Sequence, residues 1–249
     1  MTAVGRIAAE SGAAWRSFAR RKTAVFFTFF FPVILILIFG VLVQTGGGGG
    51  LFAEPPGYYV PGYLAVVVLF TPLSRIGHTV SRHRESNQFE KLVTTPLTRA
   101  EWLLAHTLVN VAIIGLASII ILVLVALLTG AGVSLSSLPV VAAFIAIGVA
   151  LFCGFGALLG SLASSQDGVV AASNGVALPL LFLSETFVPP EMLPAWFRPA
   201  MNLSPLTYFA RGVRDVTYAG TGAGVDLLVL GVLAVAFFVA GAYAIPRTD

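Results

Sequence analysis

The sequence predicts an all-α membrane protein with six transmembrane helices, an N-terminal interfacial helix and an outer re-entrant hairpin between spans five and six. Hydrophobic residues make up 57% of the 249 residues and only 10% are charged, against roughly 25% in an average soluble domain. A water-soluble fold of this length cannot hide so much apolar surface, because a single core buries only part of it. The mean hydropathy of +0.95 likewise indicates that lipid is the solvent.

Each predicted span is an apolar run close to the roughly 20 residues that cross the hydrocarbon core of a bilayer. Residues 44–57 separate the first two runs, and their consecutive glycines and paired prolines are typical of a flexible connector. The remaining loops leave no room for a second soluble domain. The predicted spans are residues 23–43, 58–78, 103–129, 138–163, 169–184 and 225–244.

Residues 1–22 precede the first span and are too polar to cross a membrane. Apolar residues recur in them at helical spacing with charges between, which predicts an amphipathic helix on the inner leaflet whose basic residues face headgroups or a partner. A disordered tail is the alternative. We therefore divide the chain into this helix and a transmembrane domain, residues 23–249. The periodic apolar residues are Val4, Ile7, Ala8, Ala14, Trp15 and Phe18.

The distribution of Lys and Arg predicts the orientation, because these residues accumulate on the cytoplasmic side of a membrane. With the N-terminus inside, eleven of the 14 basic residues lie on the inner side, and only Arg198, Arg211 and Arg214 lie outside. This bias predicts a multi-pass plasma-membrane protein with both termini in the cytoplasm. It also accounts for the net charge of +3 without a nucleic-acid partner.

Residues 82–101 form the longest predicted cytoplasmic excursion. Pro96 cannot sit in a helix interior without breaking it, whereas Thr98 with Glu101 three residues later is a capping box that opens a helix. The sequence therefore predicts a short helix, a proline turn and the start of the third span.

Residues 185–206 contain too many prolines to cross the membrane and too many aromatic residues for a solvated loop. Irregular backbone at membrane depth is tolerated only where protein or trapped water satisfies its hydrogen bonds, so we predict a re-entrant or interfacial hairpin on the outer face. Ser204 and Pro205 then suit the N-cap and first position of a helix. We expect this amphipathic helix, which carries Arg211, to lie in the outer interface.

The chain lacks a phosphate-binding loop, because neither of its two lysines follows a glycine-rich loop. We assign it no catalytic residue, no bound cofactor and no metal ligand. The predicted spans carry no ionisable residue near their centres, which argues against an ion-coupled carrier. Gly156 and Gly160 have the spacing that permits close helix approach, either within one subunit or between two.

Two groups of residues, one on each predicted side of the membrane, form spaced motifs. The inner group comprises Arg84, Glu85, Glu90, Leu92, Thr95, Pro96, Leu97 and Arg99, and the outer group, counted with Glu185 as a gate, comprises Pro194, Trp196, Pro205, Tyr208 and Arg211. These motifs resemble those of the permease subunit of ABC-2 type (type V) exporters, including daunorubicin-resistance-type permeases. The chain departs from that pattern at residues 86–88 and at Glu185, where the family often has glycine.

The resemblance implies that residues 90–97 form a coupling helix, anchored by Leu92 and Leu97, that docks on a separate ABC ATP-binding subunit. That subunit would bind ATP and magnesium. The resemblance also implies two permease halves, identical or different, that export a substrate through or along the membrane and contact membrane lipids. The absence of ionisable groups near the centres of the spans indicates an apolar pathway, which suits an amphipathic, drug-like or lipid-linked substrate. The alternatives are an inert basic loop at this position, an energy-independent channel or scramblase, and a membrane-embedded lipid-modifying enzyme.

Overall fold

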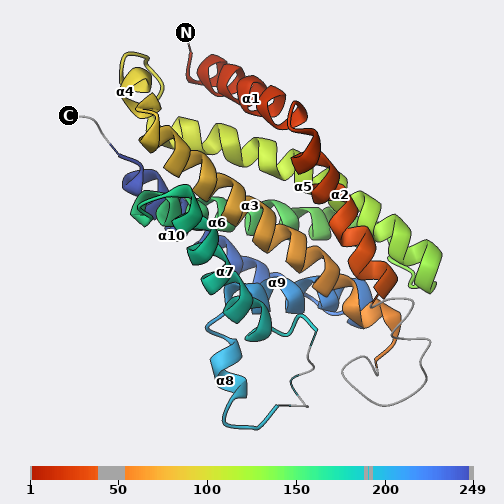
Figure 1. The fold of residues 1–249 in the computed structure, drawn as a ribbon. Helices are drawn as coiled ribbons and strands as arrows, with labels where there is room; N and C mark the ends of the chain where they lie inside the picture. The colour runs from red at the N-terminus through yellow and green to blue at the C-terminus, as the bar shows by residue number, and fades with distance from the viewer. Residues whose placement is uncertain (1, 39–53, 188–189, 191–192, 247–249) are drawn as a thin grey trace.

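The computed structural model describes residues 2–38, 54–187, 190 and 193–246, and no strand occurs among them. The predicted all-α class is confirmed. Long helices run side by side through the molecule (Figure 1). The helices are α1 (Ala3–Ala19), α2 (Lys22–Leu35), α3 (Val60–Glu85), α4 (Gln88–Val93), α5 (Arg99–Thr129), α6 (Leu138–Leu162), α7 (Gln166–Phe182), α8 (Arg198–Met201), α9 (Pro205–Arg214) and α10 (Gly224–Ala244).

Four of the described helices, α3, α5, α6 and α10, are long and apolar enough to cross a membrane. Together α1 and α2 pass the same test, although they meet at a bend of 80°, so the number of candidate spans is four or five. The predicted first span, residues 23–43, extends beyond the described residues. Helix α7 occupies the predicted fifth span but has only 17 residues. The six-span count therefore stays a prediction.

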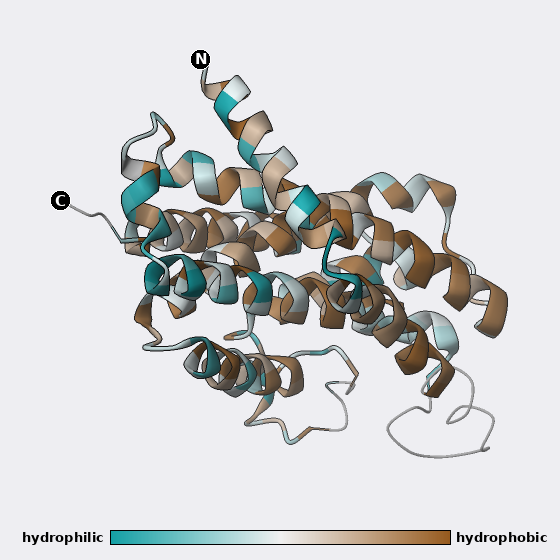
Figure 2. Cartoon of the chain, turned by 45° about the horizontal axis from the view of Figure 1, so that its top comes forward, coloured by the Kyte–Doolittle hydropathy of each residue, from teal (hydrophilic) through white to brown (hydrophobic). Residues whose placement is uncertain are grey.

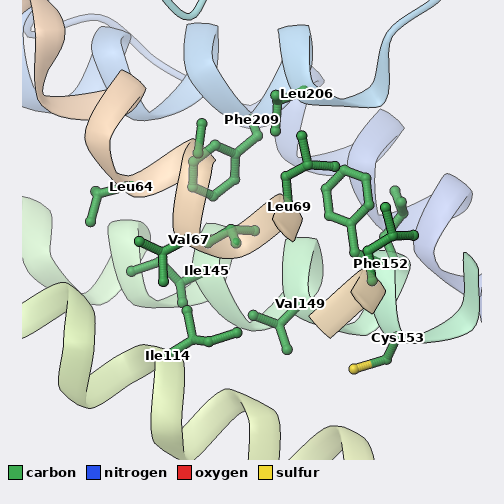
Figure 3. Packing of buried hydrophobic residues seen from close by; sticks show 14 of the residues in the cluster. Leu64, Val67, Leu69, Ile114, Ile145, Val149, Phe152, Cys153, Leu206 and Phe209 are labelled. Atoms are coloured by element: carbon green, nitrogen blue, oxygen red, sulfur yellow. The ribbon is translucent and has the colours of Figure 1, made fainter. Parts of the chain in front are cut away.

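Helix α3 is the most buried of the four long helices and packs along α6, which also packs along α10. Figure 3 shows the core where these helices meet: Leu69 of α3 and Phe152 of α6 lie close to Leu206 and Phe209 of α9. All four side chains are fully buried. Apolar packing between α3, α6 and α9 thus forms the centre of the bundle.

Close helix crossings depend on glycines of α6. A Cβ added at Gly156 would lie 2.5 Å from the carbonyl oxygen of Leu73, and one at Gly160 would collide with the backbone of Gly77 on α3. A Cβ at Gly154 would collide with α10. Gly156 and Gly160 therefore join two helices of the same chain, the first of the two arrangements considered from sequence.

One end of the bundle, which we call the α4 end, holds α4 and both ends of the described chain (Figure 1). Hydrophobic residues dominate the long helices, and hydrophilic residues gather towards this end (Figure 2). Helix α3 reaches the α4 end because it continues to Glu85, beyond the predicted limit of residue 78. Arg75 and His78 consequently lie well inside a helix rather than at its terminus.

Helix α9 buries the apolar face predicted for it against protein. It packs against α3, α6 and α10, and Leu206, Phe209 and Val213 are fully buried. Periodicity reveals that a helix has an apolar face, but not whether lipid or protein covers it. Here the bundle covers it.

Charged residues of helix α1 contact helix α5. The Arg6 guanidinium donates to both carboxylate oxygens of Glu101 on α5, at 3.1 and 2.5 Å, and Glu10 lies 3.2 Å from His106 of the same helix. Trp15, in contrast, is exposed. Arg6, one of the basic residues predicted to face headgroups or a partner, is thus paired with a carboxylate of the same chain.

We predict that Gly160→Ala lowers the thermal unfolding midpoint of the purified protein in detergent, because overpacking costs about 1–3 kcal/mol. Gly231→Ala on α10 is the matched control, since an added Cβ there meets no atom within 4 Å. The control should be neutral or slightly stabilising, by up to about 1 kcal/mol. Equal midpoints for the two variants would contradict the close α3–α6 crossing.

Candidate functional site

The predicted helix, proline turn and helix of residues 82–101 are present. Helix α3 ends at Glu85, and Asn87 reverses the chain with a left-handed φ of 52° before α4 begins. The turn that contains Pro96 leads into α5. There the Thr98 hydroxyl accepts from the Glu101 amide at 3.2 Å and the Glu101 carboxylate accepts from the Thr98 amide at 2.9 Å. The predicted capping box is confirmed.

Arg84 binds the end of α6. Its Nη1 donates to the carbonyl oxygens of Gly160, Ser161 and Ala163, at 3.2, 2.5 and 3.0 Å. The last carbonyl groups of a helix have no partners within the helix, and a cation there also interacts favourably with the helix dipole. Arg84 therefore fastens the end of α3 to the end of α6.

Glu85 makes the complementary contact with the start of α7. Its carboxylate accepts from the backbone amide of Gln166 at 3.1 Å, from the Gln166 side chain at 2.8 Å and from the Ser81 hydroxyl at 3.1 Å. A negative charge is favourable at a helix N-terminus. The Arg84–Glu85 pair thus joins α3 to two neighbouring helix ends of opposite polarity.

Arg99 and Glu101, in the first turn of α5, also bind other helices of the chain. Arg99 donates to the carbonyl oxygen of Tyr243, in the last turn of α10, at 3.0 Å. Glu101 holds Arg6 of α1. Of the residues predicted to contact a partner, Arg84, Glu85 and Arg99 therefore bind other helices of this chain.

An aromatic contact holds α4 against the bundle. Phe89 is only 7% exposed, and its ring lies 5.4 Å from His83 of α3 and 5.5 Å from Trp102 of α5, measured between ring centroids. Leu92 and Leu97 are half-buried and pack against the same core. The sequence analysis missed Phe89; an apolar residue between polar neighbours in a short helix was the available signal.

The remaining residues of the segment form an exposed face. Glu90, Lys91, Thr95 and Pro96 are exposed, as is Thr94 between them. Among the ion pairs of the described residues, none involves Glu90 or Lys91. We call these five residues the exposed face of α4.

A second polar cluster lies at the opposite end of α3. The buried carboxylate of Glu185 accepts from Arg211 Nε at 3.4 Å and from Arg211 Nη2, which raises the pKa of Arg211 because the hydrogen bond favours the charged guanidinium. Arg214 Nη1 lies 3.8 Å from the same carboxylate, and Asp226 lies 4.0 Å from Arg211. The sequence analysis did not include Arg214 or Asp226 in this site.

Arg214 connects this cluster to the turn before α3. It donates to the backbone carbonyls of Tyr58, at 3.3 Å, and Glu185, and its guanidinium lies 4.0 Å from the centre of the Tyr58 ring. Three segments far apart in the chain therefore meet at Glu185: the loop after α7, helix α9 and the turn before α3.

The other residues predicted for the outer site lie around this cluster or apart from it. Pro205 is the first residue of α9, and the Tyr208 hydroxyl donates to the Asn202 carbonyl at 3.0 Å. Pro194 and Trp196 are exposed, Trp196 to 79%. They do not join the ion pairs around Glu185.

The apolar long helices and the all-α fold define a multi-pass membrane protein. The chain belongs to the ABC-2 type transporter family, whose model matches residues 9–218. It is also similar to the daunorubicin resistance ABC transporter permease protein DrrB1 of Streptomyces coeruleorubidus, with 27% identity over 168 residues. That alignment covers 66% of this chain and 58%, less than two thirds, of the relative. The protein is thus an ABC-2 type permease, as its sequence motifs predicted.

We predict that Arg84→Gln destabilises the protein by about 1.5–3 kcal/mol, the usual contribution of hydrogen bonds to a charged group. Hydrogen exchange should quicken at the amides of residues 161–168, where α6 ends and α7 begins. Arg84→Lys should be intermediate, because lysine lacks the planar fork of donors. Lys91→Gln, on the exposed face, is the control and should stay within about 0.5 kcal/mol of wild type; unchanged exchange in Arg84→Gln would refute the capping role.

A double-mutant cycle tests the outer ion pair. Glu185→Gln and Arg211→Gln should show a coupling free energy between about 0.5 and 3 kcal/mol in thermal or denaturant unfolding, as residues in direct contact do. Arg198 is exposed and binds the Leu193 carbonyl instead. The cycle of Glu185→Gln with Arg198→Gln should therefore be additive, and additivity in both cycles would exclude the pair.

Proposed function

We propose that this chain is the membrane-spanning permease subunit of an ATP-driven exporter in the plasma membrane. Six spans would place both termini in the cytoplasm, and the α4 end would face the same compartment. The common location of α4 and both described chain ends supports this orientation (Figure 1). So does the excess of basic residues on the predicted inner side.

The exposed face of α4 is the proposed docking surface for a separate ABC ATP-binding subunit, which would bind ATP and magnesium. One observation carries this proposal: Arg84, beside α4, holds three carbonyl groups at the end of α6. Glu85 and Arg99 hold the ends of α7 and α10. A force applied to α4 would therefore reach several helices at once rather than one flexible loop.

The proposed transport unit contains a second permease half, identical or different. Large apolar side chains outside any described cavity lining are exposed along α2 and α7, among them Phe26, Phe30 and Phe182, and lipid or the second half would cover them. An amphipathic, drug-like or lipid-linked substrate suits a pathway between long helices that are mostly apolar. The predicted hairpin of residues 185–206, whose Glu185 pairs with Arg211 of α9, would act as the outer gate.

Copurification with a co-expressed ATP-binding subunit tests this function. Glu90→Lys and Lys91→Glu should each weaken the complex about tenfold or more, because a like charge placed against a complementary surface costs several kcal/mol. Glu54→Lys is the matched control, since Glu54 is exposed at the opposite end, and it should bind as wild type does. If nothing copurifies with wild type, or both α4 variants bind normally, an energy-independent channel or scramblase, or a lipid-modifying enzyme, becomes the better interpretation.

A further inference from the structure

A cavity of about 760 Å³ lies between α1, α2, α3 and α7. Its wall on α3 extends from Phe70 to His83, the half of that helix nearest α4. On α7 it includes Gln166, in the first turn. The cavity therefore belongs to the α4 end of the molecule and is separate from the ion pairs around Glu185.

The charges that line this cavity are unbalanced. Arg21, Arg75 and Arg82 face one carboxylate, that of Glu10, which already lies 3.2 Å from His106. Among the ion pairs of the described residues, none includes any of these three arginines. An anion in the cavity would supply the missing negative charge.

Arg75 is half-buried and lies in the interior of α3. Its Nη1 donates a long hydrogen bond of 3.5 Å to Asn110 Oδ1, and the centre of its guanidinium lies 4.4 Å from the centroid of the Phe18 ring. A charged group away from water is costly unless it is paired. Arginine is also suited to planar, two-point binding of carboxylate or phosphate.

The lining changes from apolar to basic towards the α4 end. Along α3 the order is Phe70, Arg75 and Arg82, and 12 residues of helix span about 18 Å. Along α2, which precedes α3 with the opposite chain direction, the order is Phe31, Phe27 and, just before the helix, Arg21. Both walls therefore match a molecule with an anionic head and an apolar tail.

We propose that this cavity binds an anionic amphiphile, with its phosphate or carboxylate head between Arg21, Arg75 and Arg82 and its tail along Phe27, Phe31 and Phe70. This proposal adds a substrate class to the proposed export function. It rests on that function only if the bound amphiphile is the transported substrate. The same chemistry suits an anionic lipid that stays bound from the surrounding membrane.

Thermal unfolding of the purified full-length protein in dodecyl maltoside tests the site, because a ligand that binds the folded state raises the unfolding midpoint. Dodecyl phosphate should raise it, whereas dodecyltrimethylammonium and inorganic phosphate at the same concentration should not. Arg75→Gln and Arg82→Gln should each weaken the apparent affinity for dodecyl phosphate about tenfold or more. Arg75→Lys, which keeps the charge, should retain most of it.

Arg20→Gln is the matched control, because Arg20 is exposed and lies outside the cavity lining. Its affinity for dodecyl phosphate should equal that of wild type. The proposal is overturned if the cationic amphiphile stabilises equally, if inorganic phosphate alone suffices, or if Arg20→Gln loses as much affinity as the cavity variants.

A second experiment distinguishes substrate from resident lipid. The permease with its ATP-binding subunit is placed in phosphatidylcholine vesicles with a fluorescent dodecyl phosphate analogue, and the analogue in the outer leaflet is quenched from outside. ATP-dependent transfer that Arg75→Gln abolishes assigns the cavity to the substrate, and binding without transfer assigns it to a resident lipid; both support the site. Because the binding assay needs no ATP-binding subunit, its failure is distinguishable from failure of the proposed function.

Discussion

The hydrogen bonds between Arg84 and the last carbonyl groups of α6 are the interaction on which the α4 end depends. A helix end in or near lipid leaves polar backbone groups that water cannot fully satisfy. Here one short segment satisfies several of them with charges of suitable sign: arginines at the ends of α6 and α10, and Glu85 at the start of α7. The segment proposed to face a partner is therefore also the segment that joins the helices.

Close helix packing in the centre of the bundle connects the α4 end to the rest of the molecule. Lipid provides little hydrophobic driving force between apolar helices, so close approach at small residues becomes important. Gly160 brings α6 into backbone contact with α3, and Gly154 does the same towards α10. Displacement at the α4 end would thus be passed along helices in direct contact. At the other end, Arg211 and Arg214 of α9 bind Glu185, in the loop after α7, and Arg214 also binds Tyr58, in the turn before α3.

Local signals in the sequence predicted local structure well. Composition indicated membrane helices, and Pro96 with Thr98 and Glu101 predicted the turn and the cap, since the atoms involved lie within a few residues. The partners of Arg84 could not be predicted in this way, because they are 76 or more residues away and are backbone carbonyls, which every residue has. Similarly, the amphipathic pattern of α9 did not reveal that protein covers its apolar face. For the outer site, Arg211 and Glu185 were identified, but their contact depends on tertiary packing.

The most direct test is a distance measurement by electron spin resonance across the α4 end. Cys153 is the only cysteine, so a Cys153→Ala background allows spin labels at Gln88, in α4 but outside the docking face, and at Ser164, in the turn between α6 and α7; both positions are exposed. In the complex with the ATP-binding subunit, we expect one narrow distance distribution that does not change when ATP is added and that broadens in Arg84→Gln. A distance that changes with ATP in the wild-type sequence would show that α4 moves independently of α6 and α7, and would contradict the account.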